Sequence, residues 1–199
     1  MSRKKIYIAG SGGLAKEVNS LFLANSREFV FAGYLDEVRE NCDSSKNIFP
    51  IGSFKPNAVV VAIGDPKLKA RLRDRFGDAY FPALIHERAI VTDAQIGRGS
   101  IIFPNVTLTA NNVIGSFCTI YQNCSVSHDT VIGGYCNITP GVDIAGRCKI
   151  GSHVYLGIGS SISNNISICD YAIVGAGAVV VDDITEPGTY VGVPARKIK

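Results

Sequence analysis

Aliphatic residues recur at every sixth position over the second half of the chain. Sixteen consecutive members of this series, from Ile90 to Val180, are Ile, Leu or Val. Four residues after each of them stands a small or apolar residue, with Asn112 as the exception. An α-helix cannot hold every sixth residue on one face, because six residues carry it about 240° beyond a whole turn. The period therefore indicates short strands joined by corners.

Three such hexads close one triangular coil, and stacked coils place both repeat positions inside the coil. The hexads run from Ile90 to about Thr185 without an insertion. With coils spaced like neighbouring strands, at about 4.8 Å, they form roughly five coils and a prism about 25 Å long. We therefore predict a parallel β-helix of hexapeptide repeats that carries no long loop.

The first part of the chain has a different pattern. Short apolar runs predict strands near residues 5–10, 29–35 and 58–63, and other segments predict helices near 14–24 and 67–76. A loop through Pro50 separates the second and third strands in this prediction. Seven of the nine Leu lie before residue 90. We predict a small Rossmann-like α/β domain over residues 1–85, followed by the β-helix domain with a C-terminal tail over residues 86–199.

A glycine-rich turn follows the first predicted strand. Its pattern, Gly10-x-Gly12-x-x-Ala15, resembles a dinucleotide fingerprint, in which glycines let the backbone approach a pyrophosphate and a later acid accepts from ribose hydroxyls. Asp36 and Glu37 end the second strand and supply such an acid. This favours a nucleotide-type ligand, while a merely tight turn stays the alternative. The domain is short for a full dinucleotide fold, which disfavours a hydride-transfer enzyme.

Composition removes several classes of protein. The chain is 46% apolar and 19% charged, which is too apolar for intrinsic disorder. Its net charge of +3 is too mild to imply nucleic acid or an anionic membrane surface as a partner. The apolar run Ile6–Ala9 is shorter than the core of a signal peptide, and no later run reaches membrane-spanning length. We expect a cytoplasmic protein.

The six cysteines form no CxxC pair, which argues against a zinc site or a disulfide framework. Four of them occupy the small inward position of the repeat, where a thiol packs as a small apolar group: Cys118, Cys124, Cys136 and Cys148. The three histidines stand far apart in the sequence, without the spacing of a metal site. We expect no metal.

The strongest candidate for chemistry is His128, which follows the repeat residue Val126 by two positions and precedes Asp129. A neutral imidazole is a suitable base for activating an amine or a hydroxyl, and an adjacent carboxylate can fix its tautomer. A surface histidine beside a surface aspartate is the alternative. His86 and His153 are expected to be structural or exposed.

Four segments carry motifs of one enzyme family: Ile6–Gly13, Ser127–Asp129, Ile173–Ala178 and Val191–Arg196. Together they resemble the sialic-acid-cluster (NeuD-like) family of left-handed β-helix sugar acetyltransferases. The similarity covers nearly the whole chain and is greatest to members that N-acetylate nucleotide-linked 4-amino-4,6-dideoxy sugars. The left hand of the β-helix follows from this resemblance alone, since the repeat spacing cannot show it.

The resemblance implies direct acetyl transfer from acetyl-CoA to the 4-amino group of a nucleotide-linked sugar, for polysaccharide or glycan biosynthesis. His128 would be the general base and Asp129 its supporting acid. The active sites would lie between the subunits of a homotrimer. For acetyl-CoA the resemblance implies Gly146 near the thioester oxygen, Ile158 and Ala176 along the pantetheine arm, and Arg196 and Lys197 near the phosphates. For the nucleotide sugar it implies Gly12, Gly13, Leu14, Asp36, Glu37, Gly64 and Lys69.

Asn137 departs from the family pattern, because close relatives carry a second histidine at this place, near the acetyl group. An amide can still donate a hydrogen bond there. Since no long loop covers the prism, we expect the N-terminal domain to hold the acceptor, which favours a large nucleotide-linked molecule. Two alternatives stay open: an O-acetyltransferase acting on a sugar of the sialic acid type, and a non-catalytic trimer that binds nucleotide sugars.

Overall fold

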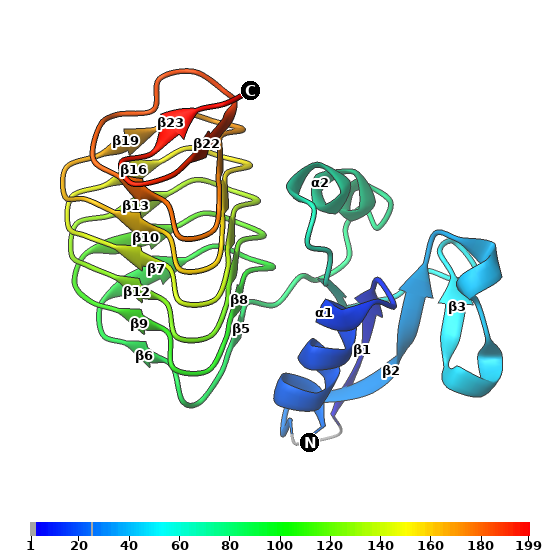
Figure 1. Ribbon diagram of the computed structural model, residues 1–199. Coiled ribbons are helices and arrows are strands. Elements are labelled where there is room, and N and C mark those ends of the chain that lie inside the picture. Colours follow the sequence, from blue (N-terminus) through cyan, green and yellow to red (C-terminus); the bar gives the residue numbers. More distant parts are fainter. Residues whose placement is uncertain (1–2, 25) are drawn as a thin grey trace. The chain divides into compact units, whose positions relative to one another are not determined.

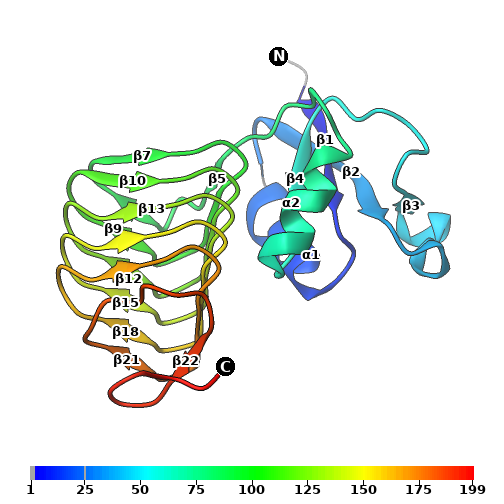
Figure 2. The same cartoon turned by 90° about the horizontal axis from the view of Figure 1, so that it is seen from above.

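Two structural units follow each other along the chain, Met1–Pro82 and Ala83–Lys199. Figures 1 and 2 show both units in the computed structural model. The structure describes residues 3–24 and 26–199. The helices in these ranges are too short or too polar to cross a membrane.

The N-terminal unit is built on a four-stranded parallel sheet with strand order β3-β2-β1-β4. Its strands are β1 (Lys4–Ala9), β2 (Phe29–Asp36), β3 (Ile48–Pro50) and β4 (Val59–Val61). The helices are α1 (Gly13–Val18), which continues as the π-helical η1 (Asn19–Leu23), and α2 (Pro66–Asp74). Two short 3₁₀ segments, η2 (Arg39–Asn41) and η3 (Ser44–Lys46), precede β3. Apolar residues of β1 and β4, such as Ile8 and Val60, form the core and are fully buried.

The strand β3 corrects the prediction of a loop through Pro50. Asn47 turns the chain with a positive φ of 57°, and β3 then pairs in parallel with the end of β2. Phe49 lies against β2 at Gly33, where a Cβ would stand only 2.7 Å from the phenyl ring. The strand forms because of this packing between residues distant in the sequence, and a short apolar run alone does not predict it.

The second unit is a prism of three parallel sheets (Figure 1), here called faces 1, 2 and 3. Face 1 contains β5 (Leu84–Ile85), β8 (Ile101–Ile102), β11 (Thr119–Ile120), β14 (Asn137–Ile138), β17 (Tyr155–Leu156), β20 (Ile173–Val174), β22 (Thr189–Val191) and the antiparallel β23 (Arg196–Lys197). Face 2 contains β6 (Ile90–Val91), β9 (Thr107–Leu108), β12 (Ser125–Val126), β15 (Asp143–Ile144), β18 (Ser161–Ile162) and β21 (Val179–Val180). Face 3 contains β7 (Ala94–Ile96), β10 (Asn112–Ile114), β13 (Val131–Ile132), β16 (Lys149–Ile150) and β19 (Ser167–Ile168).

Residues that are three hexads apart lie directly above one another, because Ile120 pairs with both Ile102 and Ile138 and the same register continues along each face. The repeat residues point inward and are buried from Ile102 to Val180. The four cysteines at the small inward position are free thiols with at most 1% exposure. The prediction that they pack in the core is confirmed.

Each corner of the prism has a residue with positive φ, between 57° and 70°, that recurs once in every coil. The corner between faces 1 and 2 has Asn105, Asn123, Gly141, Gly159 and Gly177, and the corner between faces 2 and 3 has Asn111, Asp129, Arg147 and Asn165. At the corner between faces 3 and 1, four of these residues are rings that stack in one column: Phe117, Tyr135, His153 and Tyr171. Side chains that lie in such a row are therefore direct neighbours along the prism.

Candidate active site

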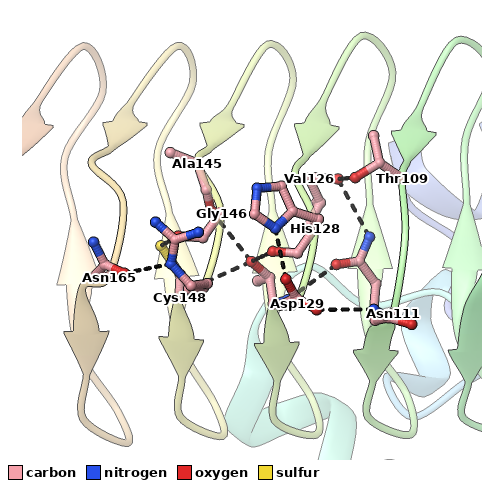
Figure 3. Close-up of polar contacts among 12 residues, drawn as sticks. Thr109, Asn111, Val126, His128, Asp129, Ala145, Gly146, Cys148 and Asn165 are labelled. Carbon is pink, nitrogen blue, oxygen red and sulfur yellow. Dashed lines mark hydrogen bonds and ion pairs between the residues drawn. The ribbon is translucent and has the colours of Figure 1, made fainter.

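His128 and Asp129 lie at the corner between faces 2 and 3, where the chain leaves β12 and enters β13 (Figure 3). Their side chains are about half exposed, at 49% and 46%. The strand β12 (Ser125–Val126) ends two residues before His128, and the imidazole projects from the tight turn that forms the corner. The sequence places a base and a carboxylate side by side at an accessible corner.

The imidazole Nδ1 lies 2.7 Å from Asp129 Oδ2. A carboxylate that accepts a hydrogen bond from Nδ1–H selects the tautomer whose Nε2 carries a lone pair. The hydrogen bond with His128, followed by one from Asn111, holds the pKa of the Asp129 carboxyl below its usual value. The pair is therefore arranged for His128 Nε2 to accept a proton.

Two further polar residues of the same corner belong to this group, and the sequence reasoning missed both. Asn111 Nδ2 donates to Asp129 Oδ1 at 2.9 Å. Arg147, on the other side of Asp129, contributes to the lowered pKa of that carboxyl and donates from Nε to Asn165 Oδ1 at 2.7 Å. The signal that could have found them is the spacing of one whole coil, or three hexads, which separates each from Asp129.

Asn112, the exception at the inward position, is explained by its hydrogen bonds. Its side chain is buried, accepts from Thr130 N at 3.2 Å and donates to Val126 O at 3.4 Å. These two backbone groups stand just before and just after the segment that contains His128. The amide therefore fixes the corner from inside the prism.

Gly146 lies directly above His128, one coil further on. A Cβ at Gly146 would stand 2.8 Å from His128 Nε2 and 2.9 Å from Cε1. Within the described part of the chain, the Gly146 N–H donates no backbone hydrogen bond, whereas the next residue donates to His128 O at 2.9 Å. The prism thus brings His128, Asp129 and Gly146 together at one corner.

The other residues predicted for acetyl-CoA lie elsewhere on the prism. Ile158 and Ala176 stack one above the other at the corner between faces 1 and 2, and both are exposed. Asn137 lies in β14 on face 1, between Thr119 and Tyr155 in neighbouring coils. Within one chain, these residues do not share a corner with His128.

Arg196 and Lys197 form the short strand β23, which pairs with β22. Arg196 makes an ion pair with Asp182 at 3.3 Å, and Lys197 makes one with Glu186 at 2.9 Å. Both cations are thus engaged by carboxylates of their own chain, and a phosphate would have to compete with those carboxylates.

In the N-terminal unit, most residues predicted for the nucleotide sugar lie at one edge of the sheet. Gly12, Gly13 and Leu14 follow β1, Asp36 ends β2, and Gly64 follows β4. These three parallel strands are neighbours, and Gly10 N donates to Leu35 O at 2.8 Å where β1 and β2 end. Asp36 accepts hydrogen bonds from the Ser11 hydroxyl and from Val38 N.

Glu37 and Lys69 have other surroundings than expected. Glu37 is paired with Arg71 at 2.6 Å and with Arg75 at 3.7 Å, both on the helix α2 or at its end. Lys69 is buried on the same side of α2 as Leu72, with only 1% exposure. Lys69 is therefore not accessible to a phosphate in this structure. Arg71 and Arg75, which the sequence reasoning did not name, are exposed cations of this region.

The N-terminal unit also contains two cavities. One has a volume of about 510 Å³ and is lined by residues that include Lys4, Tyr7 and Tyr80. The other has a volume of about 600 Å³ and is lined by residues that include Lys55 and Arg75. None of the seven residues predicted for the nucleotide sugar lines either cavity.

Known proteins match this chain in two ways, through a family model for the N-terminal unit and through solved structures similar over the whole chain. The family model described as the PglD N-terminal domain matches residues 5–76. No curated protein matches the chain at a significant level.

Several solved structures are similar over the whole chain. A mutant of perosamine N-acetyltransferase from Caulobacter crescentus, in complex with CoA and GDP-perosamine, is 27% identical, with a TM-score of 0.89 over 100% of this chain and 98% of that one. The protein WeeI from Acinetobacter baumannii AYE is 28% identical, with a TM-score of 0.84 over 98% and 100% of the two chains. The acetyltransferase domain of PglB from Neisseria gonorrhoeae FA1090 is 25% identical, with a TM-score of 0.87 over 98% and 100%. The predicted fold, an α/β part followed by a left-handed parallel β-helix, is confirmed.

Proposed function

We propose that this chain, an acyltransferase similar to the nucleotide-linked amino-sugar N-acetyltransferases of the PglD and NeuD type, acetylates the 4-amino group of a nucleotide-linked 4-amino-4,6-dideoxy sugar with acetyl-CoA. The observation that carries the proposal is the exposed pair of His128 and Asp129, with 2.7 Å between Nδ1 and Oδ2. The CoA and GDP-perosamine bound to the Caulobacter enzyme support the choice of substrates.

The proposed reaction is a direct transfer at His128. The amine nitrogen attacks the thioester carbonyl carbon, and His128 Nε2 takes the proton that the nitrogen loses as the C–N bond forms. The tetrahedral intermediate then breaks its C–S bond, and the imidazolium returns the proton to the leaving sulfur. Asp129 holds the imidazole and stabilises its charged form while it carries this proton.

The negative charge on the thioester oxygen needs a donor during the attack. We assign the Gly146 N–H to this role, because Gly146 lies one coil beyond His128, next to its ring, and its N–H donates no backbone hydrogen bond among the described residues. An oriented backbone donor of this kind stabilises the developing oxyanion more than it stabilises the neutral carbonyl.

The nucleotide part of the acceptor is assigned to the N-terminal unit. Gly12, Gly13, Asp36 and Gly64 support this, because they follow or end three neighbouring parallel strands. Small ligands commonly bind beyond the carboxyl ends of such strands. Arg71 is the cation that we assign to the phosphates, since its ion pair with Glu37 leaves its side chain 64% exposed.

The acetyl-CoA site is assigned to the contact between subunits of a homotrimer. His128 and Gly146 lie at one corner of the prism, whereas Ile158 and Ala176 lie at another, so one subunit would supply the base and its neighbour the pantetheine wall. Mixing inactive His128→Ala subunits with inactive Ile158→Glu subunits would then restore part of the activity, because some mixed trimers combine two intact corners. Light scattering of the purified protein measures the trimer independently.

The experiment that tests the reaction measures thiol release from acetyl-CoA with a panel of acceptors. We expect wild-type activity with nucleotide-linked 4-amino sugars and a loss of about 10²- to 10⁴-fold in kcat for His128→Ala. His86→Ala is the matched control, since His86 lies at the start of the prism, away from this corner. Full activity of His128→Ala would overturn the mechanism, and transfer only to sugar hydroxyls would assign O-acetylation instead.

A further inference from the structure

We infer that Asn111 is a positioning residue for the reaction: its side-chain amide fixes the Asp129 carboxylate and, through it, the orientation and tautomer of the His128 imidazole. The inference rests on the proposed function of His128 as the base. Asn111 touches neither acetyl-CoA nor the acceptor in this assignment, and its effect passes through Asp129.

The hydrogen bonds of Asp129 show why such a residue is needed. One carboxylate oxygen, Oδ2, lies 2.7 Å from His128 Nδ1, and the other, Oδ1, accepts from Asn111 Nδ2 at 2.9 Å. With only the imidazole as partner, a carboxylate that is 46% exposed could rotate about χ2 and exchange its hydrogen bond with water. A second donor on the opposite oxygen stops this rotation.

The backbone makes the Asn111 amide a fixed support. Asn111 and Asp129 have almost the same positive φ, 57° and 58°, and occupy the same corner of successive coils. Asp129 N donates to Ala110 O at 2.9 Å, and this backbone hydrogen bond joins the turns of the two successive coils next to the side-chain contact. Asparagine tolerates this backbone conformation better than most residues do, so its side chain is presented without strain.

Asn112 holds the same segment from the other side of the wall. Its buried amide binds the backbone at Val126 and Thr130. Asn111 binds the Asp129 side chain at the surface (Figure 3). The two consecutive amides therefore restrict both the main chain and the carboxylate of the segment that carries the base.

The prism contains a matched pair that has the geometry of Asn111 and Asp129 without their chemistry. Asn105 Nδ2 donates to Asn123 Oδ1 at 3.1 Å, again between successive coils, and both residues have a positive φ, 59° and 60°. This pair lies at the corner between faces 1 and 2 and includes no titratable group. It shows what such a contact contributes to the fold alone.

The test compares Asn111→Gly with Asn105→Gly. Glycine keeps the positive φ in both variants, as it does at Gly141 in the same kind of corner. We expect the two variants to lose similar, small amounts of thermal stability, and only Asn111→Gly to lose about tenfold in kcat, with the KM for acetyl-CoA unchanged. In an Asp129→Asn background, Asn111→Gly should cause no further loss, because the path through the carboxylate is already broken.

A spectroscopic measurement makes the result independent of turnover. With ¹⁵N-labelled histidine, the wild-type His128 ring should show one tautomer with the proton on Nδ1, and Asn111→Gly should show a mixture of tautomers while Asn105→Gly does not. Equal kcat and one unchanged tautomer in Asn111→Gly would overturn the inference. A wild-type protein that acetylates no acceptor would instead overturn the proposed function, so the two failures are distinguishable.

Discussion

The imidazole of His128 occupies the place where a side chain at position 146 would lie. A Cβ built on Gly146 comes within 2.8 Å of Nε2 and 3.2 Å of Cδ2. Van der Waals contact between carbon and nitrogen requires more than this, so only glycine leaves room for the ring in its present orientation. The choice of residue at position 146 is thus restricted by the imidazole of His128.

We expect Gly146→Ala to lower the acetyl-transfer rate at least tenfold, since a displacement of about 1 Å in a reacting group can cost 10²-fold. The backbone of Gly146 does not have a positive φ, so alanine meets the imidazole and not backbone strain. Thermal melting gives the control: Gly146→Ala should destabilise the wild type but not the His128→Ala variant, which has no ring to displace. Equal destabilisation in both would show that the methyl group meets something other than His128.

Asn112 allows a test of the hydrogen bonds inside the prism. Thr130, the next residue in the same inward row, accepts from Cys148 N through its hydroxyl at 3.3 Å. We therefore expect Asn112→Thr to keep an acceptor for Thr130 N. Valine has nearly the same shape as threonine but no hydroxyl, so Asn112→Val should leave that buried N–H without an acceptor. Chemical denaturation should place the valine variant about 1–3 kcal/mol below the threonine variant in unfolding free energy. Equal stability would mean that the amide only fills space.

The cysteines of the prism should resist alkylation in the folded protein. Burial raises the pKa of Cys124 to about 11, so at pH 8 its thiol is neither ionised nor accessible. Iodoacetamide followed by mass spectrometry should modify only Cys42 and Cys169, which are partly exposed, and should reach Cys118, Cys124, Cys136 and Cys148 only after denaturation. Modification of Cys124 before Cys42 would contradict the packing described here.

His153 should be replaceable by phenylalanine without loss of stability. Its ring stacks between Tyr135 and Tyr171, with centroids 5.0 and 4.7 Å away, and its Nδ1 is buried without a hydrogen-bond partner among the described residues. Phenylalanine keeps the stacking and removes the unsatisfied nitrogen, and Phe117 shows that the ring fits this backbone. We expect His153→Phe to melt at or above the wild-type temperature and His153→Ala to lose roughly 0.5–1.5 kcal/mol per lost ring contact.

The pairing of β23 with β22 should depend on pH in a defined window. The hydrogen bond from Lys197 holds the pKa of Glu186 below its usual 4.5, and the same contact raises the pKa of Lys197 above its usual 10.5. The carboxylate therefore stabilises the fold above pH 4.5, and this contribution is lost as the pH falls through its lowered pKa. The ammonium does so below pH 10.5, and its contribution is lost as the pH rises through its raised pKa.

The measurement is the hydrogen-exchange protection of Ile198 N–H, which donates to Thr189 O at 2.8 Å. Protection should be constant between these limits and should fall in acid. Glu186→Gln is the control, because it removes the titrating carboxylate and should make the protection independent of pH in the acid range. An unchanged acid profile in this variant would assign the dependence to other groups.

The repeated core of the prism was predictable because every inward position imposes the same requirement. An aliphatic side chain at Ile120 must meet those at Ile102 and Ile138, and the sequence shows this as a strict period. The pair of His128 and Asp129 was visible for a simpler reason, since the two residues are adjacent. Local patterns that repeat, or that lie within one corner, can be read without coordinates.

What escaped prediction depends on contacts between distant residues. The strand β3 forms because Phe49 packs on Gly33, and the burial of Lys69 follows from the side of α2 that meets the core. Asn111 was missed although it precedes Asp129 by one whole coil, because outward positions carry no hydrophobic period to draw attention to them. The hexad count also explains why His128 and Ile158 do not share a corner. Five hexads lie between them, and the chain returns to the same corner only after a multiple of three hexads.

The antiparallel strand β23 has a further consequence for the protein in solution. An open end of a parallel β-helix exposes unpaired N–H and C=O groups, which can recruit further strands and lead to aggregation. On face 1 the last edge is a short strand made of Arg196 and Lys197, both charged and of opposite direction to the strands below. Short, charged edges resist such growth. These two cations thus make the last edge of face 1 unfavourable for the addition of a further strand.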